Sequence, residues 1–221
     1  MSSADKTTVR PTPLDDDDIR LARYENATGT PTISRTGLGR RFLRWRIAMQ
    51  LYGLGPRRKD RTAYIFIGPP ASGKSTYGES LARDIGAMVI DCDLAKERLP
   101  EYGNGRYASL VHEESDLIMD AVYLRTIRAG GNLVILLVGR NSQKIEDIQQ
   151  ELLGLDYKVH LRFVPLDAEL AAERVVQRYR KRGRFVDPSY VLYGVSNKPQ
   201  TTYDRLRYLG GWTSCETIEQ K

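Results

Sequence analysis

Short apolar runs alternate with segments of helical periodicity from residue 62 onward. The runs are of strand type, and they lie at 64–67, 88–90, 133–138 and 158–164. The periodic segments between them predict helices at 74–84, 113–128, 145–153 and 168–181. Strands that alternate with helices of this length indicate a parallel sheet with right-handed crossovers, so we expect an α/β fold.

Single residues support several of these boundaries. Leu133 to Val138 is uninterrupted aliphatic sequence, which is typical of a central parallel strand buried on both faces. Gly130 and Gly131 are expected to end the preceding helix, and Asp167 has the right chemistry to cap the helix that begins at Ala168. The expected apolar face of helix 113–128 consists of Leu117, Ile118, Ala121, Val122 and Leu124.

The first 60 residues differ from the rest, so we divide the chain into an N-terminal extension (1–60) and a main domain (61–221). Residues 1–38 are rich in Thr, Pro, Asp and Gly and show no sustained periodicity, which predicts a loosely ordered arm. Residues 40–61 predict a short basic helix with an apolar set of Phe42, Leu43, Trp45, Ile47, Ala48, Leu51 and Tyr52.

The basic segment 40–61 has more than one interpretation. We favour a packing element that covers one edge of the main domain and leaves its arginines solvated. The alternatives are contact with a membrane surface or with nucleic acid, because basic amphipathic stretches serve both. Nothing in the sequence separates these alternatives.

Composition narrows the class of partner. Of the 221 residues, 41% are hydrophobic and 28% are charged, which is an ordinary globular balance. The net charge of +6 favours anionic ligands such as nucleotides, phosphorylated metabolites or nucleic acid. Cys92 and Cys215 are the only cysteines, and the residues after Met1 lack a secretory pattern, so we expect a cytoplasmic protein.

A phosphate-binding loop follows the first strand. Its residues match the pattern G-x-x-x-x-G-K-[ST] without a mismatch: Gly68, Pro69, Pro70, Ala71, Ser72, Gly73, Lys74 and Ser75. The glycines let backbone N–H groups approach phosphate oxygens at the positive end of the next helix. We expect ATP here, with Lys74 at the β and γ phosphates, Ser75 on Mg²⁺ and Thr76 near the α phosphate.

Four further stretches resemble the zeta-toxin family of P-loop kinases. They read Ile90-Asp91-Cys92-Asp93, Leu99-Pro100-Glu101-Tyr102, Glu173-Arg174-Val175-Val176-Gln177-Arg178-Tyr179 and Gly183-Arg184-Phe185-Val186. The resemblance covers roughly residues 62 to 195. It implies a P-loop kinase-type parallel sheet flanked by helices, here preceded by a basic helical extension.

The resemblance also implies roles for acidic and basic residues. Asp93 is the expected general base that takes a proton from an acceptor hydroxyl, and Asp91 is the expected carboxylate at Mg²⁺, although the two roles could be exchanged. Either carboxylate could instead cap a helix that begins near Leu94. Arg178 and Arg184 correspond to the family's lid arginines, with Arg174 as a lesser candidate, and the alternative is a solvated basic helix.

One departure from the family concerns the acceptor. Zeta toxins usually end the third strand in an acidic residue followed by Gly-Thr, whereas this chain reads Val138-Gly139-Arg140-Asn141. The family's acceptor, UDP-N-acetylglucosamine, therefore cannot be assumed from the resemblance, and both a nucleotide sugar and another, more anionic acceptor stay open. Arg140 could equally be a phosphate contact that faces the lid.

The leading hypothesis is an ATP-dependent phosphotransferase that uses a hydroxyl of a small acceptor. The alternatives are a 5′-hydroxyl polynucleotide kinase and a nucleotide-dependent binding or effector module. An antitoxin or other protein partner is left open. His112 and His160 have no clustered partners at metal-ligand spacing, and Cys92 between two aspartates is not expected to act as a nucleophile.

Overall fold

The computed structural model describes residues 17–28, 36–55 and 58–219, with the side chains of the first helix described as far as Arg23. The elements up to the middle of the sheet are α1 (Asp17–Thr28), α2 (Leu38–Gly53), β1 (Thr62–Ile67), α3 (Lys74–Asp84), β2 (Met88–Ile90), α4 (Cys92–Lys96), the 3₁₀ segment η1 (Pro100–Gly105) and α5 (His112–Arg128). They are followed by β3 (Leu133–Leu137), α6 (Ser142–Leu153), β4 (Lys158–Phe163), α7 (Ala168–Arg182), the π-helical segment η2 (Tyr190–Val195), α8 (Lys198–Leu206) and β5 (Ser214–Thr217).

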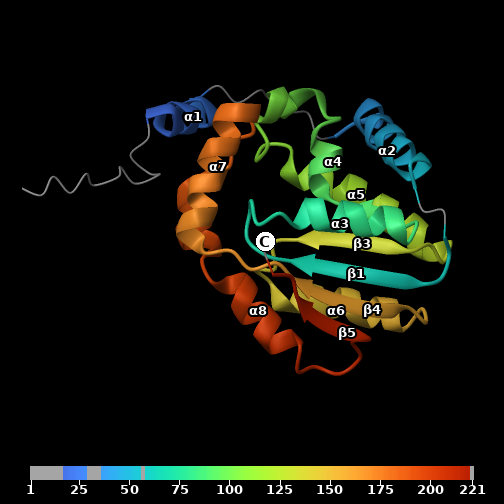
Figure 1. Cartoon of the computed structure of the whole chain (residues 1–221). Helices are drawn as coiled ribbons and strands as arrows, with labels where there is room; N and C mark the ends of the chain where they lie inside the picture. Colours follow the sequence, from blue (N-terminus) through green and yellow to red (C-terminus); the bar gives the residue numbers. More distant parts are fainter. Residues whose placement is uncertain (1–16, 29–35, 56–57, 220–221) are drawn as a thin grey trace, which may run out of the picture.

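The strands form one parallel sheet in the order β2-β3-β1-β4-β5 (Figure 1). β1 lies at its centre, where Ile65 is in register with Ile135 of β3 and Leu161 of β4. All carboxyl ends therefore meet at one edge of the sheet, which is where ligands gather in open α/β folds. The predicted P-loop kinase-type α/β fold is confirmed.

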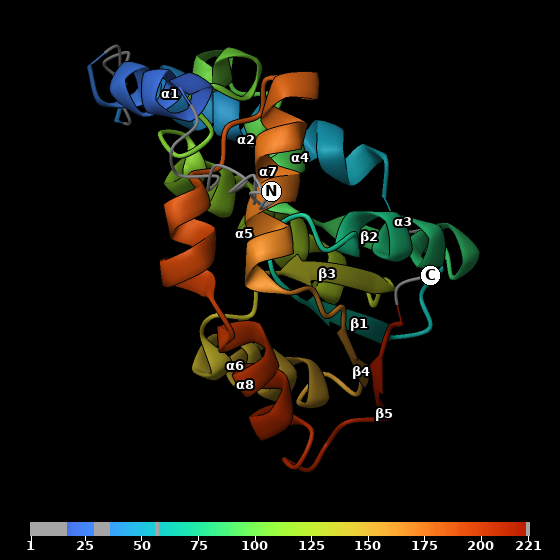
Figure 2. The same ribbon diagram turned by 60° about the vertical axis from the view of Figure 1, so that its left-hand side comes forward.

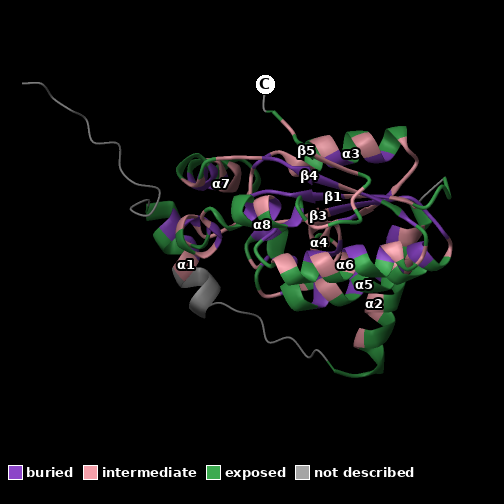
Figure 3. Ribbon diagram, turned by 90° about the horizontal axis from the view of Figure 1, so that it is seen from below, coloured by how far each residue is buried: buried purple, intermediate pink, exposed green. Residues whose placement is uncertain are grey.

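The sheet is the middle of three layers (Figure 3). Successive side chains of a strand point to opposite faces, so Ile65 and Ile67 pack toward α5 and α6, whereas Phe66 packs toward α3. Both faces of β1 are thus covered by helices. This burial explains the uninterrupted apolar runs in the sequence.

The structure refines the predicted helices. Asp167 caps α7 as expected, because its carboxylate accepts from the N–H groups of Glu169 and Leu170 at 2.8 and 3.2 Å. The apolar face predicted for 113–128 was wrong in part: Leu117 and Leu124 are 55% and 39% exposed. The buried face of α5 instead includes Ile118, Met119, Val122 and Ile127.

The prediction of a loosely ordered arm over residues 1–38 was wrong for 17–28, which form α1. Ile19 and Ala22 of this helix are completely buried. Figure 2 shows α1 beside the far end of α7, and Asp18 pairs with Arg180 there at 3.4 Å. Residues 1–16 and 29–35 lie outside the described residues.

The predicted basic helix is α2, and it packs against α5 and α4. Ile47, Ala48 and Leu51 join the main hydrophobic core, as expected of a packing element. Trp45 and Phe42 do not: they are 56% and 61% exposed and stack on each other, because they lie on the opposite side of the helix. In the described part of the chain, no helix has both the length and the apolar character to cross a membrane.

An ion cluster fastens α2 to the main domain. The guanidinium of Arg40 donates to Glu101 of η1 at 2.7 and 3.0 Å, and to Glu114 of α5. The side chain of Glu114 is only 2% exposed, and Arg44 approaches it to 3.9 Å. A carboxylate buried to this degree depends on its cationic partners.

Replacing Arg40 with Gln is expected to lower the free energy of unfolding by about 3 kcal/mol, because Glu114 would lose its main partner in a buried position. Arg41 on the same helix is exposed, so Arg41→Gln is a matched control that should change stability by less than about 0.5 kcal/mol. Urea unfolding followed by circular dichroism measures both. Equal stability of the two variants would contradict the assigned role of the ion cluster.

Candidate active site

The loop between β1 and α3 has the backbone of an anion cradle. Only glycine fits at Gly68, because a Cβ there would lie 2.3 Å from the carbonyl oxygen of Val164. Gly73 and Ala71 adopt left-handed conformations, with φ of 87° and 60°. The loop therefore turns tightly enough to direct N–H groups inward at the start of α3, where the helix dipole is positive.

Lys74 begins α3 and folds back over this loop. Its ammonium group donates to the carbonyl oxygens of Gly68 and Pro69, both at 2.7 Å, and lies 3.3 Å from the hydroxyl of Ser72. Burial lowers the pKa of Lys74 to about 7, although Asp91 nearby opposes the shift. Ser75 and Thr76 follow in the first turn of α3 and are exposed.

The acidic pair lies at the carboxyl end of β2, next to the loop. Asp91 caps α4, because its carboxylate accepts from the N–H of Asp93 at 3.0 Å. Asp93 itself lies in the first turn of α4, pairs with Arg184 and contacts Lys96 at 3.3 Å. The capping alternative thus applies to Asp91 and not to Asp93.

The two carboxylates differ in their electrostatic surroundings. Burial, with the neighbouring charge of Asp93, raises the pKa of Asp91 to about 6. Burial also opposes ionisation of Asp93, but the charges of Arg184 and Lys96 together outweigh burial and hold the pKa of Asp93 below its ordinary value. Asp93 is therefore the carboxylate that stays ionised throughout the neutral range.

Two arginines reach the loop from α7 and the turn that follows it. Arg178 is on α7, and Arg184 follows Gly183, whose left-handed conformation ends the helix. Among the described residues, the Nε atoms of Arg178 and Arg184 are buried without a hydrogen-bond partner. Burial lowers the pKa of Arg178 to about 10, and Arg184 adds to this shift. Buried, unpaired guanidinium donors at a phosphate cradle indicate a place for an anion.

The structure brings together five of the predicted site residues. Lys74, Asp91, Asp93, Arg178 and Arg184 lie close enough for the charges of the other four to act on Lys74. Arg174, the lesser candidate, lies 3.5 Å from the carbonyl oxygen of Ala71 in the loop. The catalytic and metal roles assigned from the sequence stay predictions.

Sequence reasoning missed two side chains of this cluster. Lys96 contacts Asp93 from one helical turn further along α4, a spacing that could have revealed it. Tyr102 is buried in η1, where burial raises its pKa and the charges of Arg184 and Asp93 act on it. Tyr102 belongs to one of the family-like stretches, but no pattern in the sequence indicated which way it would point.

Arg140 follows β3 and turns toward η2. Its guanidinium lies over the ring of Tyr190, 5.2 Å from the centroid, and donates to the Tyr190 hydroxyl at 3.1 Å. Arg140 remains exposed at this edge of the sheet. Its charge is thus available to a ligand, although its described contact is to an aromatic ring.

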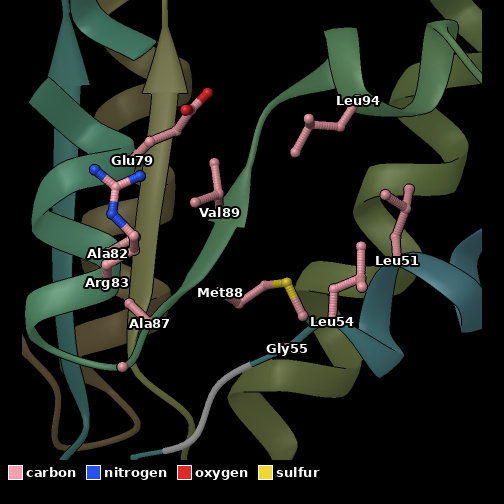
Figure 4. A pocket seen from close by; sticks show the side chains of 11 residues that line it. Leu51, Leu54, Gly55, Glu79, Ala82, Arg83, Ala87, Met88, Val89 and Leu94 are labelled. Atoms are coloured by element: carbon pink, nitrogen blue, oxygen red, sulfur yellow. The ribbon is translucent and has the colours of Figure 1, made fainter. Parts of the chain in front are cut away.

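Two hollows lie near these elements. One of about 600 Å³ adjoins the loop at Pro69 and is bounded by the end of β4 and the starts of α7 and α8. The other, of about 520 Å³, runs along the outer edge of β2. There Met88 extends toward Leu51 and Leu54 at the end of α2, whereas Val89 points toward α3 (Figure 4). This second hollow is mainly apolar and contains none of the predicted site residues.

The histidines and cysteines add no metal centre. In residues 17–28, 36–55 and 58–219, no three His, Cys, Asp or Glu side chains are grouped so that they could hold a metal ion. Cys92 donates to Asp116 at 2.8 Å, and burial together with this contact raises its pKa, which agrees with an unreactive thiol.

The parallel sheet, the phosphate-binding loop and the arginines above it define a P-loop kinase-type protein. Comparison with protein families identifies which one. The model of the zeta toxin family matches residues 52–205, well over half of the chain, so the protein belongs to the zeta toxin family. The resemblance found in the sequence is confirmed, and it supports a nucleotide-dependent, kinase-like function.

Solved structures share the fold. A structure of the PezAT chromosomal toxin-antitoxin system of Streptococcus pneumoniae has a TM-score of 0.64 at 18% identity, over 80% of this chain and 76% of that one. The AvrRxo1-ORF1:-ORF2 complex with ATP has a TM-score of 0.62 at 16% identity, over 86% and 70%. A candidate kinase from Chloroflexus aurantiacus has a TM-score of 0.55 at 18% identity, over 72% and 85%. No curated protein sequence matches this chain.

The lowered pKa of Lys74 gives a prediction for nucleotide binding. With a pKa of about 7, most Lys74 side chains carry no charge at a pH of about 8. Phosphate oxygens in the loop would favour the ammonium form and raise this pKa, so ATP binding without Mg²⁺ is expected to take up roughly one proton. Calorimetry in buffers of different ionisation enthalpy measures the uptake. Lys74→Met should abolish it, and a buffer-independent enthalpy for the unmodified protein would contradict the prediction.

Proposed function

We propose that this protein is an ATP-dependent phosphotransferase that moves the γ-phosphate to a hydroxyl group of a small anionic acceptor. The observation that carries the proposal is the set of buried cations around the loop. Arg178 and Arg184 hold unpaired Nε donors there, and Asp93 stays ionised beside them. Cationic donors and a carboxylate base gathered at one phosphate-binding loop suit transfer of a phosphoryl group.

The loop residues would hold the donor. Backbone N–H groups in the part of the loop that follows the two prolines, from Ala71 to Ser75, would cradle the phosphates. Lys74 would move from the loop carbonyls to the β and γ oxygens. The hydroxyl of Ser75 and the carboxylate of Asp91 are oxygen ligands of the kind that Mg²⁺ prefers, and both lie beside the loop. When bound, ATP supplies the phosphoryl group, and Mg²⁺ neutralises part of its charge.

Asp93 would act on the acceptor side. Its pairing with Arg184 keeps the carboxylate unprotonated but makes it a weak base. Once Arg184 moves from Asp93 to the transferring phosphoryl group, the pKa of Asp93 rises and its oxygen can accept the proton of the attacking hydroxyl. The same movement would bring the positive charge of Arg184 next to the phosphoryl oxygens. One side chain would then couple the release of the base to stabilisation of the transferring group.

An anionic acceptor is favoured by the end of β3. Arg140 occupies the edge of the sheet where zeta toxins carry an acid, and it is exposed beside the site. A cation there attracts phosphate or carboxylate groups on the acceptor, whether the acceptor is a nucleotide sugar or another anionic molecule. Its stacking on Tyr190 would hold the guanidinium in place.

A further anionic partner for residues 40–61 also stays a proposal. Arg40 and Arg44 are engaged with Glu114, so they are not available to a partner. Arg41 and Arg46, in contrast, are exposed on either side of the stacked Phe42 and Trp45. This outward stripe of α2 fits nucleic acid or a membrane surface, and it keeps a 5′-hydroxyl polynucleotide kinase as the second candidate function.

A protein partner and a cytoplasmic location complete the proposal. Structural neighbours include a toxin-antitoxin system and a two-protein complex, which supports a partner protein for this chain as well. The cytoplasmic location rests on two cysteines that form no disulfide.

Incubation with labelled ATP and separate pools of acceptors tests the proposed function. The pools are phosphorylated metabolites, neutral sugars, nucleotide sugars and 5′-hydroxyl oligonucleotides, and Lys74→Ala serves as the inactive control. Label on phosphorylated metabolites is expected, because Arg140 favours an anionic acceptor. Label on oligonucleotides alone would establish the second candidate. Tight ATP binding without any transfer would instead favour the binding or effector module.

Asp93→Asn is expected to lower phosphoryl transfer by roughly 10² or more while leaving ATP affinity nearly unchanged, since the base acts on the acceptor. Asn keeps the size of the side chain, so its pairing with Lys96 and Arg184 weakens without a cavity. Single-turnover kinetics and calorimetry give the two quantities. Loss of ATP binding in this variant would place Asp93 at the metal ion instead.

A further inference from the structure

The turn that carries Arg184 is held by the N-terminal helix α1. We call residues 183–189 the lid turn, because they connect α7 to η2 and contain one of the two lid arginines. Figure 2 shows α1 and the end of α7 at the same corner of the molecule. No local sequence pattern indicates this contact, because 164 positions separate the two residues that make it.

The contact is a forked pair between Arg23 and Asp187. The Nε and Nη2 groups of Arg23 donate to the two carboxylate oxygens of Asp187 at 2.8 and 2.6 Å. Nη2 also donates to the hydroxyl of Ser189 at 2.6 Å, and the N–H of Ser189 donates to Asp187 at 2.8 Å. Both partners of the ion pair are about two-thirds buried, so solvent screens it only in part.

α1 presents Arg23 from a fixed position. Ile19 and Ala22 precede it on the helix and are completely buried, so the helix is anchored by packing and not by the ion pair alone. Arg20 and Asp17 lie on the exposed side and pair with each other at 3.6 Å. The buried side of α1 therefore presents Arg23 to the lid turn.

The other end of the lid turn is fixed independently. The N–H of Phe185 donates to the carbonyl oxygen of Gly105 in η1 at 3.1 Å, and the ring of Phe185 packs edge-on against Tyr179. Val186 packs into the cluster that contains Ala71 of the phosphate-binding loop. Arg184 directly precedes the η1 anchor at Phe185. The α1 anchor at Asp187 follows three residues after Arg184, at most about 11 Å from it along the chain.

We propose that Arg23 is a positioning residue for Arg184: by fixing Asp187 and Ser189 it holds the lid turn where the guanidinium of Arg184 reaches Asp93 and the phosphate position. This inference rests on the proposed function, which gives Arg184 its task. Without the fork from Arg23, the lid turn would keep the contacts of Phe185 and Val186 near its start but lose the ion pair that holds its end. Arg184 would then sample positions away from the loop, and misplacement by about 1 Å is enough to slow an enzyme strongly.

Hydrogen exchange of the lid turn tests the anchor without requiring phosphoryl transfer. In Arg23→Gln the amides of residues 183–189 should exchange roughly tenfold faster than in the unmodified protein. Arg20→Gln, on the exposed side of the same helix, should leave them within about twofold. The double variant Arg23→Gln with Asp187→Asn should exchange no faster than the faster single variant, because both changes remove one interaction. Unchanged exchange in Arg23→Gln, or equal acceleration in Arg20→Gln, would overturn the proposal.

Kinetics with the acceptor found by the labelled screen test the consequence for Arg184. Arg23→Gln should lower kcat roughly tenfold and leave the Kd of ATP within about twofold, since the loop still binds the nucleotide. Faster exchange combined with an unchanged kcat would overturn the positioning role. Absence of transfer by the unmodified protein would refute the proposed function and leave the exchange result standing, so the two failures are distinguishable.

Discussion

Burial of like charges around one small volume governs this structure. Lys74, Arg178 and Arg184 converge on the phosphate-binding loop, and burial lowers the pKa of Lys74 and of Arg178. Partly buried cations of this kind need an anion nearby. For Arg184 this anion is the carboxylate of Asp93, with which it forms an ion pair. The ion pair between Arg184 and Asp93 therefore joins the lid turn to the edge of the sheet. We propose that a bound phosphate group takes the place of the Asp93 carboxylate in this pair.

This replacement links binding to chemistry. Arg184 pairs with Asp93 and helps to keep its carboxylate ionised. In the proposed mechanism, Asp93 becomes a stronger base when another anion attracts this guanidinium. Asp91 has the opposite surroundings: burial raises its pKa, which a bound cation would reverse. Two neighbouring carboxylates of one sequence stretch thereby have pKa values shifted in opposite directions.

The N-terminal extension helps to hold the lid turn in place. α2 fastens η1 through Arg40 and Glu101, and η1 holds the start of the lid turn through the Gly105 carbonyl. α1 fastens the end of the same turn through Arg23. Two helices outside the minimal P-loop pattern therefore support the segment that carries Arg184. The predicted boundary near residue 61 stays a prediction, but α2 shares the hydrophobic core of the main domain.

The sequence by itself determined four of the five strands, the loop and the identity of the charged residues, but not β5. Apolar runs and helical spacing are local patterns that can be read from a short stretch of sequence. The loop motif can be read in the same way, because a side chain at Gly68 would clash with the backbone of Val164. Composition could not show that α1 forms, because its stability comes from burying Ile19 and Ala22 against distant elements. Nor could it separate the two sides of α2, where Arg40 is locked to Glu114 while Phe42 and Trp45 remain exposed.

Only the tertiary structure decided which charges meet. Asp91 and Asp93 are the same residue type, and the sequence does not distinguish them. Their surroundings differ because Asp91 caps α4, whereas Asp93 pairs with Arg184 of the lid turn. The pairing of Arg23 with Asp187 joins residues at opposite ends of the chain. Sequence patterns report local periodicity and backbone demands, whereas partners of this kind are chosen by the packing of whole elements, which no local window contains.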